Sequence, residues 1–168
     1  MHEVKDEGTT VIRGACIHDA AAAGELLAAL GYPSSIAQVK ERIARSAESD
    51  DTAVFVAETH HQIVGLVSFH LIPLFHADGF LGRITSFIVA PMHRQRGIGR
   101  LLAAAVEEFA WAHGCMRVEV TSGDHRPDAH SFYERMGYDL DCRRFTKRRK
   151  DAYPDQMPPT APSGSGSP

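Results

Sequence analysis

Hydrophobic residues recur along the chain with two periods, one typical of helices and one typical of strands. Apolar positions three and four residues apart predict helices at residues 20–30, from Ser34 or Ser35 to about 47, at 97–113 and at 128–136. Runs of β-branched and aromatic residues predict strands at residues 11–17, 53–57, 63–72, 80–90, 116–121 and 138–145. Asp19 and Asp128 stand where they can cap helices. This order of elements predicts an α/β (α+β) fold with a mixed sheet and helices on both faces.

The length and the C-terminal composition predict one domain followed by a tail. A chain of 168 residues suits a single domain, which we place at residues 1–150. Residues 151–168 are rich in proline, glycine and serine and have too few apolar side chains to bury a core. We therefore expect this tail to be disordered.

The charge balance argues against nucleic acid and membranes as partners. A formal net charge of -3 and a pI near 6.3 give no overall attraction to polyanions. The basic run at 143–150 has aspartates around it, which favours a solvated surface. No apolar stretch is long enough to span a membrane. The three cysteines are far apart and odd in number, which indicates a reducing compartment, so we expect a cytoplasmic protein.

The segment from the strand at 80–90 into the helix at 97–113 has the composition of an anion site. A helix N-terminus presents backbone N–H groups and the positive end of the helix dipole. Gly97 and Gly99 have no side chains to block close approach, and Arg94, Arg96 and Arg100 add positive charge. The segment therefore favours a phosphate or pyrophosphate ligand.

Two common phosphate-binding motifs do not match this segment. A P-loop requires Gly-Lys-Ser/Thr, whereas Gly97 is followed by Ile98 and Gly99 by Arg100. A dinucleotide fingerprint requires a third glycine where the chain has Leu102.

Residues 89–102 instead fit the pattern Arg/Gln-x-x-Gly-x-Gly/Ala after an apolar strand, which resembles the coenzyme A motif of the Gcn5-related N-acetyltransferase (GNAT) superfamily. Residues 129–138, Ala-His-Ser-Phe-Tyr-Glu-Arg-Met-Gly-Tyr, are similar to the last helix of the same family. Together with the order of elements, the resemblance extends from about residue 11 to 145. It implies a mostly antiparallel central sheet and acetyl-CoA as cosubstrate.

The resemblance also implies which residues hold the cosubstrate. The backbone of Phe87, Ile88 and Val89 would pair with the pantetheine arm as an added strand. The pyrophosphate would be bound by backbone amides of the following residues: Arg94, Gln95, Arg96, Gly97, Ile98, Gly99 and Arg100. Many members have asparagine where this chain has Arg126, so that contact is either lost or replaced by Arg126 with a phosphate.

Acetyl transfer requires a neutral amine, a donor to the thioester carbonyl and an acid for the departing thiolate. The resemblance implies the Val89 amide as the donor and Tyr133 as the acid, although Tyr133 also lies on an apolar helix stripe and could be a core residue. Four residues are candidates for a base, and spacing does not select among them: His70, His76, Ser86 and Glu119.

The ten histidines show no metal-ligand spacing, so we expect no metal.

These observations predict an N-acetyltransferase that transfers the acetyl group of acetyl-CoA to a primary amine of a small molecule or a protein. The alternative is a non-catalytic acetyl-CoA-binding module that regulates or senses. The sequence does not identify the acceptor. Exposed strand edges and family precedent favour a homodimer.

Overall fold

The structure is a computed structural model that describes residues 9–123, 126–141 and 145–147. The described residues belong to two compact parts, one ending at Val120 and the other beginning at Thr121. The first part contains the sheet and three α-helices, and the second contains one short α-helix.

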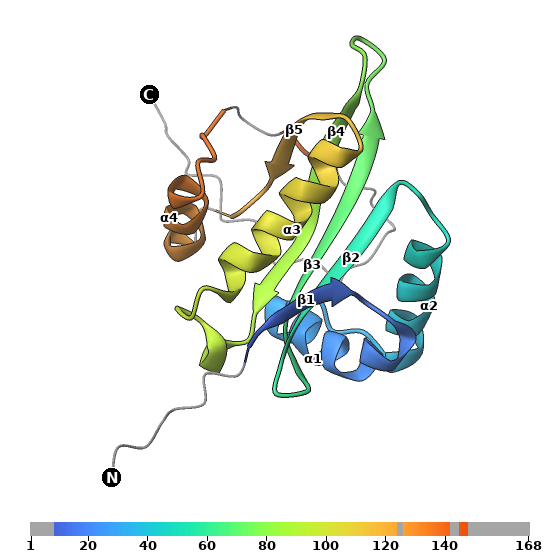
Figure 1. Ribbon diagram of the computed structural model, residues 1–168, viewed down its shortest axis with the longest axis vertical. Coiled ribbons are helices and arrows are strands. Elements are labelled where there is room, and N and C mark those ends of the chain that lie inside the picture. The colour runs from blue at the N-terminus through green and yellow to red at the C-terminus, as the bar shows by residue number, and fades with distance from the viewer. Residues whose placement is uncertain (1–8, 124–125, 142–144, 148–168) are drawn as a thin grey trace. The chain divides into compact units, whose positions relative to one another are not determined.

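The first part is built on one five-stranded sheet with the strand order β1-β2-β3-β4-β5 (Figure 1). Its strands are β1 Val11–Gly14, β2 Thr52–Thr59, β3 Gln62–Pro73, β4 Phe80–Val89 and β5 Cys115–Val120. The first three pairings are antiparallel and the pairing of β4 with β5 is parallel. The predicted mixed, mostly antiparallel sheet is thereby confirmed.

The turn between β2 and β3 shows how local conformation fixes a register. Thr59 pairs with Gln62, so the loop consists of His60 and His61 alone. Both histidines have positive φ, 50° and 61°, as a type I′ turn requires. Their left-handed conformation matches the twist of the two strands and sets the antiparallel hairpin predicted from the sequence.

Three α-helices accompany the sheet: α1 Ala20–Leu30, α2 Ile36–Ala47 and α3 Ile98–Ala112. α1 ends at Gly31, whose φ of 102° only glycine adopts freely. α2 begins with a capping box, in which the Gln38 N–H donates to Ser35 Oγ at 3.3 Å and the Ser35 N–H donates to Gln38 Oε1 at 2.9 Å. Asp19 precedes α1 as predicted, but its side chain makes no cap bond because it accepts hydrogen bonds from Arg13 instead.

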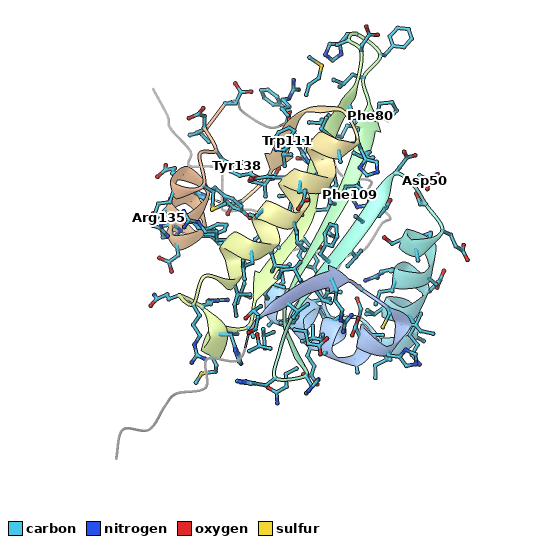
Figure 2. All side chains as sticks on the ribbon, in the orientation of Figure 1. Asp50, Phe80, Phe109, Trp111, Arg135 and Tyr138 are labelled. Carbon is cyan, nitrogen blue, oxygen red and sulfur yellow. The ribbon has the colours of Figure 1, made fainter. Side chains whose placement is uncertain are left out.

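The helices cover both faces of the sheet and form two cores. α1 and α2 pack on one face with Val56, Leu66 and Ile88. α3 packs on the other face through Ile98, Leu102, Val106 and Ala110, against Ala57, Val67, Phe69, Leu71 and Ile84. Figure 2 shows Phe109 projecting from α3, and its ring centroid lies 5.9 Å from those of Phe55 and Phe69.

The second part contains α4, Pro127–Arg135. The helix begins at Pro127 with Arg126 as N-cap, so Asp128 lies in the first turn and the predicted Asp128 cap is wrong. Pro127 explains the earlier start, because proline fits the first helical position, where no N–H is needed. Residues 138–141 and 145–147 form no strand, contrary to the strand predicted at 138–145, whose residues 142–144 lie outside the described residues. The predicted tail at 151–168 lies outside them as well.

Candidate functional site

The C-terminal end of β4 continues beyond its pairing with β5. The parallel ladder joins Phe80–Ile84 of β4 to Cys115–Val120 of β5 and ends at the pair Ile84 and Val120. β4 itself continues to Val89 and stays paired with β3 up to the pair Val89 and Gly65. The pair Ile84 and Val120 therefore divides β4 into a half that pairs with both β3 and β5 and a half that pairs with β3.

Val89 presents its backbone polar groups to the edge opposite β3. The N–H of Ala90, which belongs to the same peptide group as the Val89 carbonyl, donates to Val64 O at 2.8 Å. The Val89 carbonyl therefore points away from β3, and the Val89 N–H lies on the same side, as in any extended residue. The carbonyl accepts a hydrogen bond from Arg94 Nε at 3.1 Å.

The loop after β4 leads to the N-terminus of α3 and contains two residues in the left-handed backbone conformation. A 3₁₀ turn at Pro91–His93 is followed by Gln95 with φ 61° and by Gly97 with φ 80°. Ile98 then anchors the helix, because its side chain is only 3% exposed and packs in the α3 core. No atom lies within 4 Å of where a Cβ on Gly97 would be, so space is open in front of this residue.

Residues 94–100 of this loop and the helix start are positively charged, and we name them the anion cradle after the ligand that the sequence predicts there. Leu101 is the first residue of α3 whose N–H bonds within the helix, to Gly97 O at 3.1 Å. The N–H groups of Ile98, Gly99 and Arg100 precede it and have no intrahelical acceptor. Arg94, Arg96 and Arg100 are exposed, and residues 91–106 contain no acidic residue. Helix dipole, amides and guanidinium groups thus all favour an anion at this place.

A row of polar residues crosses the sheet on the face that carries α1 and α2. The register places Thr52, His70, Arg83 and Glu119 side by side on β2, β3, β4 and β5. Arg83 Nη1 donates to Glu119 Oε2 at 2.6 Å and Arg117 Nε donates to Glu119 Oε1 at 2.8 Å. Both carboxylate oxygens of Glu119 are thus occupied by guanidinium groups.

The sequence of the chain matches the model of the acetyltransferase (GNAT) family over residues 21–138. The chain belongs to this family.

A comparison with curated proteins agrees with the membership. The chain is 37% identical over 86 residues to aminoalkylphosphonate N-acetyltransferase of Salmonella typhimurium strain LT2, an alignment that covers 51% of this chain and 56% of that relative. The chain thus spans little more than half the length of the curated relative it matches.

Among solved structures, a transcriptional regulator from Bacillus halodurans C-125 has a TM-score of 0.77 at 21% identity and is covered completely by 84% of this chain. Aminoglycoside N-acetyltransferase AAC(6')-Iy in complex with CoA has a TM-score of 0.76 at 18% identity, with 88% of this chain covering 99% of it. At these identities the likeness shows the fold of this GNAT protein and no more.

Tyr133 and Arg126 lie in the second part of this GNAT protein, on α4. Tyr133 is partly buried, and burial raises its pKa to about 12, while the nearby charge of Arg126 opposes part of the rise. Its ring lies in edge contact with Phe132 and Tyr138, at centroid distances of 5.2 and 5.6 Å. The hydroxyl therefore stays protonated at neutral pH, as an acid must before it acts. The catalytic role of Tyr133 and the contact of Arg126 with the cosubstrate stay predictions.

The other candidate bases lie on different elements. His70 and Ser86 are on β3 and β4, and exposed His76 is in the loop between them. Thr85, which forms a hydrogen bond with His70, is not among the predicted site residues, although a signal for it is present in the chain. Thr85 and Ser86 are two successive polar residues within an apolar strand, an interruption of alternation that marks a bulge.

A pocket lies away from the anion cradle. A pocket of about 360 Å³ opens between the end of α2, β2 and the last turn of α3, with Asp50 and Phe109 among its lining residues (Figure 2). Phe109 is near the C-terminus of α3, whereas the cradle is at its N-terminus.

Within the described residues, no group of three metal-ligating side chains is present, and no helix is long and apolar enough to cross a membrane.

Proposed function

We propose that this GNAT protein transfers an acetyl group from acetyl-CoA to a primary amine. The observation that carries the proposal is the anion cradle at residues 94–100, which follows a strand end that β5 does not pair. Phosphates bind at helix N-termini through backbone amides and need few special side chains. An extended ligand arm can join a strand by backbone hydrogen bonds.

The residues of the chain suit the two ends of acetyl-CoA. The amides of Ile98, Gly99 and Arg100, with the charges of Arg94 and Arg96, would hold the pyrophosphate. Phe87, Ile88 and Val89 would hold the pantetheine arm, with Gln95 in the turn between the two subsites. When bound, acetyl-CoA supplies the thioester. The Val89 N–H, which is directed away from β3, would donate to its carbonyl oxygen.

Tyr133 would donate the proton that the departing thiolate takes up. A thiol has a pKa of about 8.5, which is lower than that of the phenol. The phenol would therefore transfer its proton to the sulfur while the C–S bond of the thioester breaks, and the phenolate would take up a proton afterwards. The support for this role is the family motif around Tyr133 and its protonated state. Arg126 would contact a phosphate from the N-cap of the same helix.

For the acceptor, we propose an amine that also carries an anionic group, with aminoalkylphosphonates as the first class to test. The relative from Salmonella typhimurium is named for such acceptors. In this chain, Arg83 and Arg117 share the single carboxylate of Glu119, so the three side chains have one net positive charge. A polycationic aminoglycoside would require acidic groups instead. Comparing an aminoalkylphosphonate with the same amine lacking the phosphonate tests this choice, and equal kcat/KM for the two would reject it.

Calorimetric titration with acetyl-CoA tests the cradle. The Gly97→Asp, Gly99→Asp double variant places carboxylates beside the proposed pyrophosphate, so we expect wild-type binding in the micromolar range and its loss in the variant. Gly114→Asp is the matched control, because Gly114 has a φ of 74° and equally open space at the other end of α3. Binding retained by the double variant, or absent from folded wild-type protein, would reject the site.

A turnover assay separates catalysis from the non-catalytic alternative. Release of CoA that depends on an added amine requires an enzyme, whereas a regulatory module binds acetyl-CoA without releasing thiol. Homodimer formation and a cytoplasmic location stay predictions.

A further inference from the structure

The strand β4 contains a bulge at Thr85. Ser68 of β3 pairs with Ser86, and the next residue, Phe69, pairs with Ile84, so Thr85 has no residue opposite it. Thr85 is also the first residue of β4 after the ladder with β5 ends at Ile84. Its side chain is exposed. Bulges of this kind redirect a side chain, and they are enriched beside active sites.

The bulge directs the Thr85 hydroxyl into a chain of hydrogen bonds on the face that carries α1 and α2. Thr85 Oγ1 lies 3.1 Å from His70 Nε2 and 2.8 Å from Ser68 Oγ. His70 Nδ1 lies 3.4 Å from Thr52 Oγ1 on the other side of the imidazole. Thr85 is thus the exposed end of a relay whose inner end is His70.

The surroundings of His70 favour the neutral form of its imidazole. The side chain is half-buried, and this burial lowers its pKa. The register places uncharged Thr52 of β2 on one side of His70 and Arg83 of β4 on the other. Glu119 and Arg117 of β5 lie beyond Arg83, and both carboxylate oxygens of Glu119 are occupied by the two guanidinium groups. A neutral imidazole has one nitrogen able to accept a proton.

We propose that His70 receives the proton of the acceptor ammonium through the hydroxyl of Thr85, an inference that rests on the proposed acetyl transfer. The ammonium gives one proton to Thr85 Oγ1 while the Thr85 hydroxyl proton passes to His70 Nε2. The products are a neutral amine with a free electron pair and an imidazolium. The imidazolium returns its proton to solvent after turnover. The second proton that the nitrogen loses on forming the amide balances the one that the thiolate takes up.

This assignment distinguishes His70 from the other three candidates. Glu119 is held by two arginines, His76 is exposed in the β3–β4 loop, and the Ser86 hydroxyl would need a base of its own. Thr85 touches the substrate in this scheme and is a catalytic residue. His70 acts through it.

The test measures kcat/KM for the amine across pH in wild type, His70→Gln, Thr85→Val and Thr85→Ser, alongside the acetyl-CoA dissociation constant. We expect His70→Gln and Thr85→Val to lower kcat/KM about 100-fold near neutral pH, a size typical of lost base catalysis. The deficit should shrink as pH approaches the pKa of the amine, because the acceptor then arrives neutral. Thr85→Ser keeps the hydroxyl and should stay close to wild type. His61→Gln, at the exposed hairpin turn, is the histidine control.

The outcomes separate this inference from the proposed function. Unchanged acetyl-CoA binding with the expected pH-dependent deficit supports the relay. A deficit of the same size at every pH, or an equal loss in Thr85→Ser and Thr85→Val, shows a structural role and overturns it. Wild-type kcat/KM retained by His70→Gln also overturns it and leaves acetyl transfer intact. Wild-type protein that binds acetyl-CoA without turnover removes the catalytic function and the relay together.

Discussion

Arg94 Nε donates a hydrogen bond to the carbonyl oxygen of Val89 at 3.1 Å and so joins the first basic residue of the cradle to the last residue of β4. The contact spans the 3₁₀ turn at Pro91–His93. It therefore fixes the loop relative to the strand. In the proposed site, this bond sets the distance between the pyrophosphate subsite and the Val89 N–H.

Removing this link should weaken acetyl-CoA binding. Arg94→Met keeps the length and apolar stem of the side chain but loses its charge and donor. We expect the dissociation constant measured by calorimetry to rise about tenfold, which corresponds to ~1.4 kcal/mol and to the usual size of one charge-assisted hydrogen bond. Arg45→Met removes another exposed guanidinium, from the last turn of α2, and should leave binding unchanged. Equal affinities for the two variants would contradict the role given to Arg94.

A glycine allows β4 to pass the buried ring of Phe69. A Cβ on Gly82 would overlap the Phe69 ring, which is 0% exposed, and would lie 3.3 Å from Cys115 Sγ. Gly82→Ala should therefore lower the free energy of unfolding by about 2–3 kcal/mol, the usual cost of overpacking a core. Urea denaturation measures it. Gly14→Ala in β1 has no atom within 4 Å of the added Cβ and should be neutral or slightly stabilising. A stable Gly82→Ala protein would show that the core relaxes around the methyl group.

Most elements and the glycine turn into α3 could be predicted from the sequence because local signals determine them, whereas anion binding at this turn stays a prediction. α1 has the predicted bounds, and Gly97 has the left-handed conformation that a close turn into a helix requires. The relay could not be predicted, since its contacts depend on which residues face each other across β2, β3 and β4. The bulge at Thr85 changes that register by one residue. Asp19 likewise has the predicted position beside α1, but its partner Arg13 becomes visible only when β1 and the helix are placed together.

The buried carboxylate of Asp19 should make stability depend on acidity. Arg13 Nη1 and Nη2 donate to its two oxygens at 2.7 and 2.8 Å, and the Cys16 N–H donates at 2.8 Å. The hydrogen bonds from Arg13 lower the pKa of Asp19 from its usual 3.8 to about 2. Because the pKa is lower in the folded state than in the unfolded state, the ionised carboxylate stabilises the fold at pH values above 3.8. This contribution is lost as the pH falls from 3.8 towards about 2.

Asp19→Asn measures this contribution. At neutral pH we expect the variant to be less stable in urea by about 2 kcal/mol, since one pKa unit corresponds to about 1.4 kcal/mol. The difference from wild type should narrow at about pH 3, where the wild-type carboxylate begins to take up a proton. Asp50→Asn changes an exposed carboxylate and should alter stability by no more than about 0.5 kcal/mol. A gap that does not depend on pH would assign the effect to shape rather than charge.

Tyr133 has two roles to distinguish, as the acid for the thiolate and as part of the partly buried stripe of α4. Because burial raises its pKa to about 12, the hydroxyl is protonated throughout the neutral range, and the tyrosine should cause no falling limb of kcat below about pH 10. Tyr133→Phe keeps the ring and removes the proton, so we expect kcat to fall about 100-fold while acetyl-CoA affinity and urea stability stay close to wild type. Tyr138→Phe, whose ring centroid lies 5.6 Å away, should keep kcat. If Tyr133→Phe keeps kcat but loses stability, the residue is a packing residue and the thiolate takes its proton from another source.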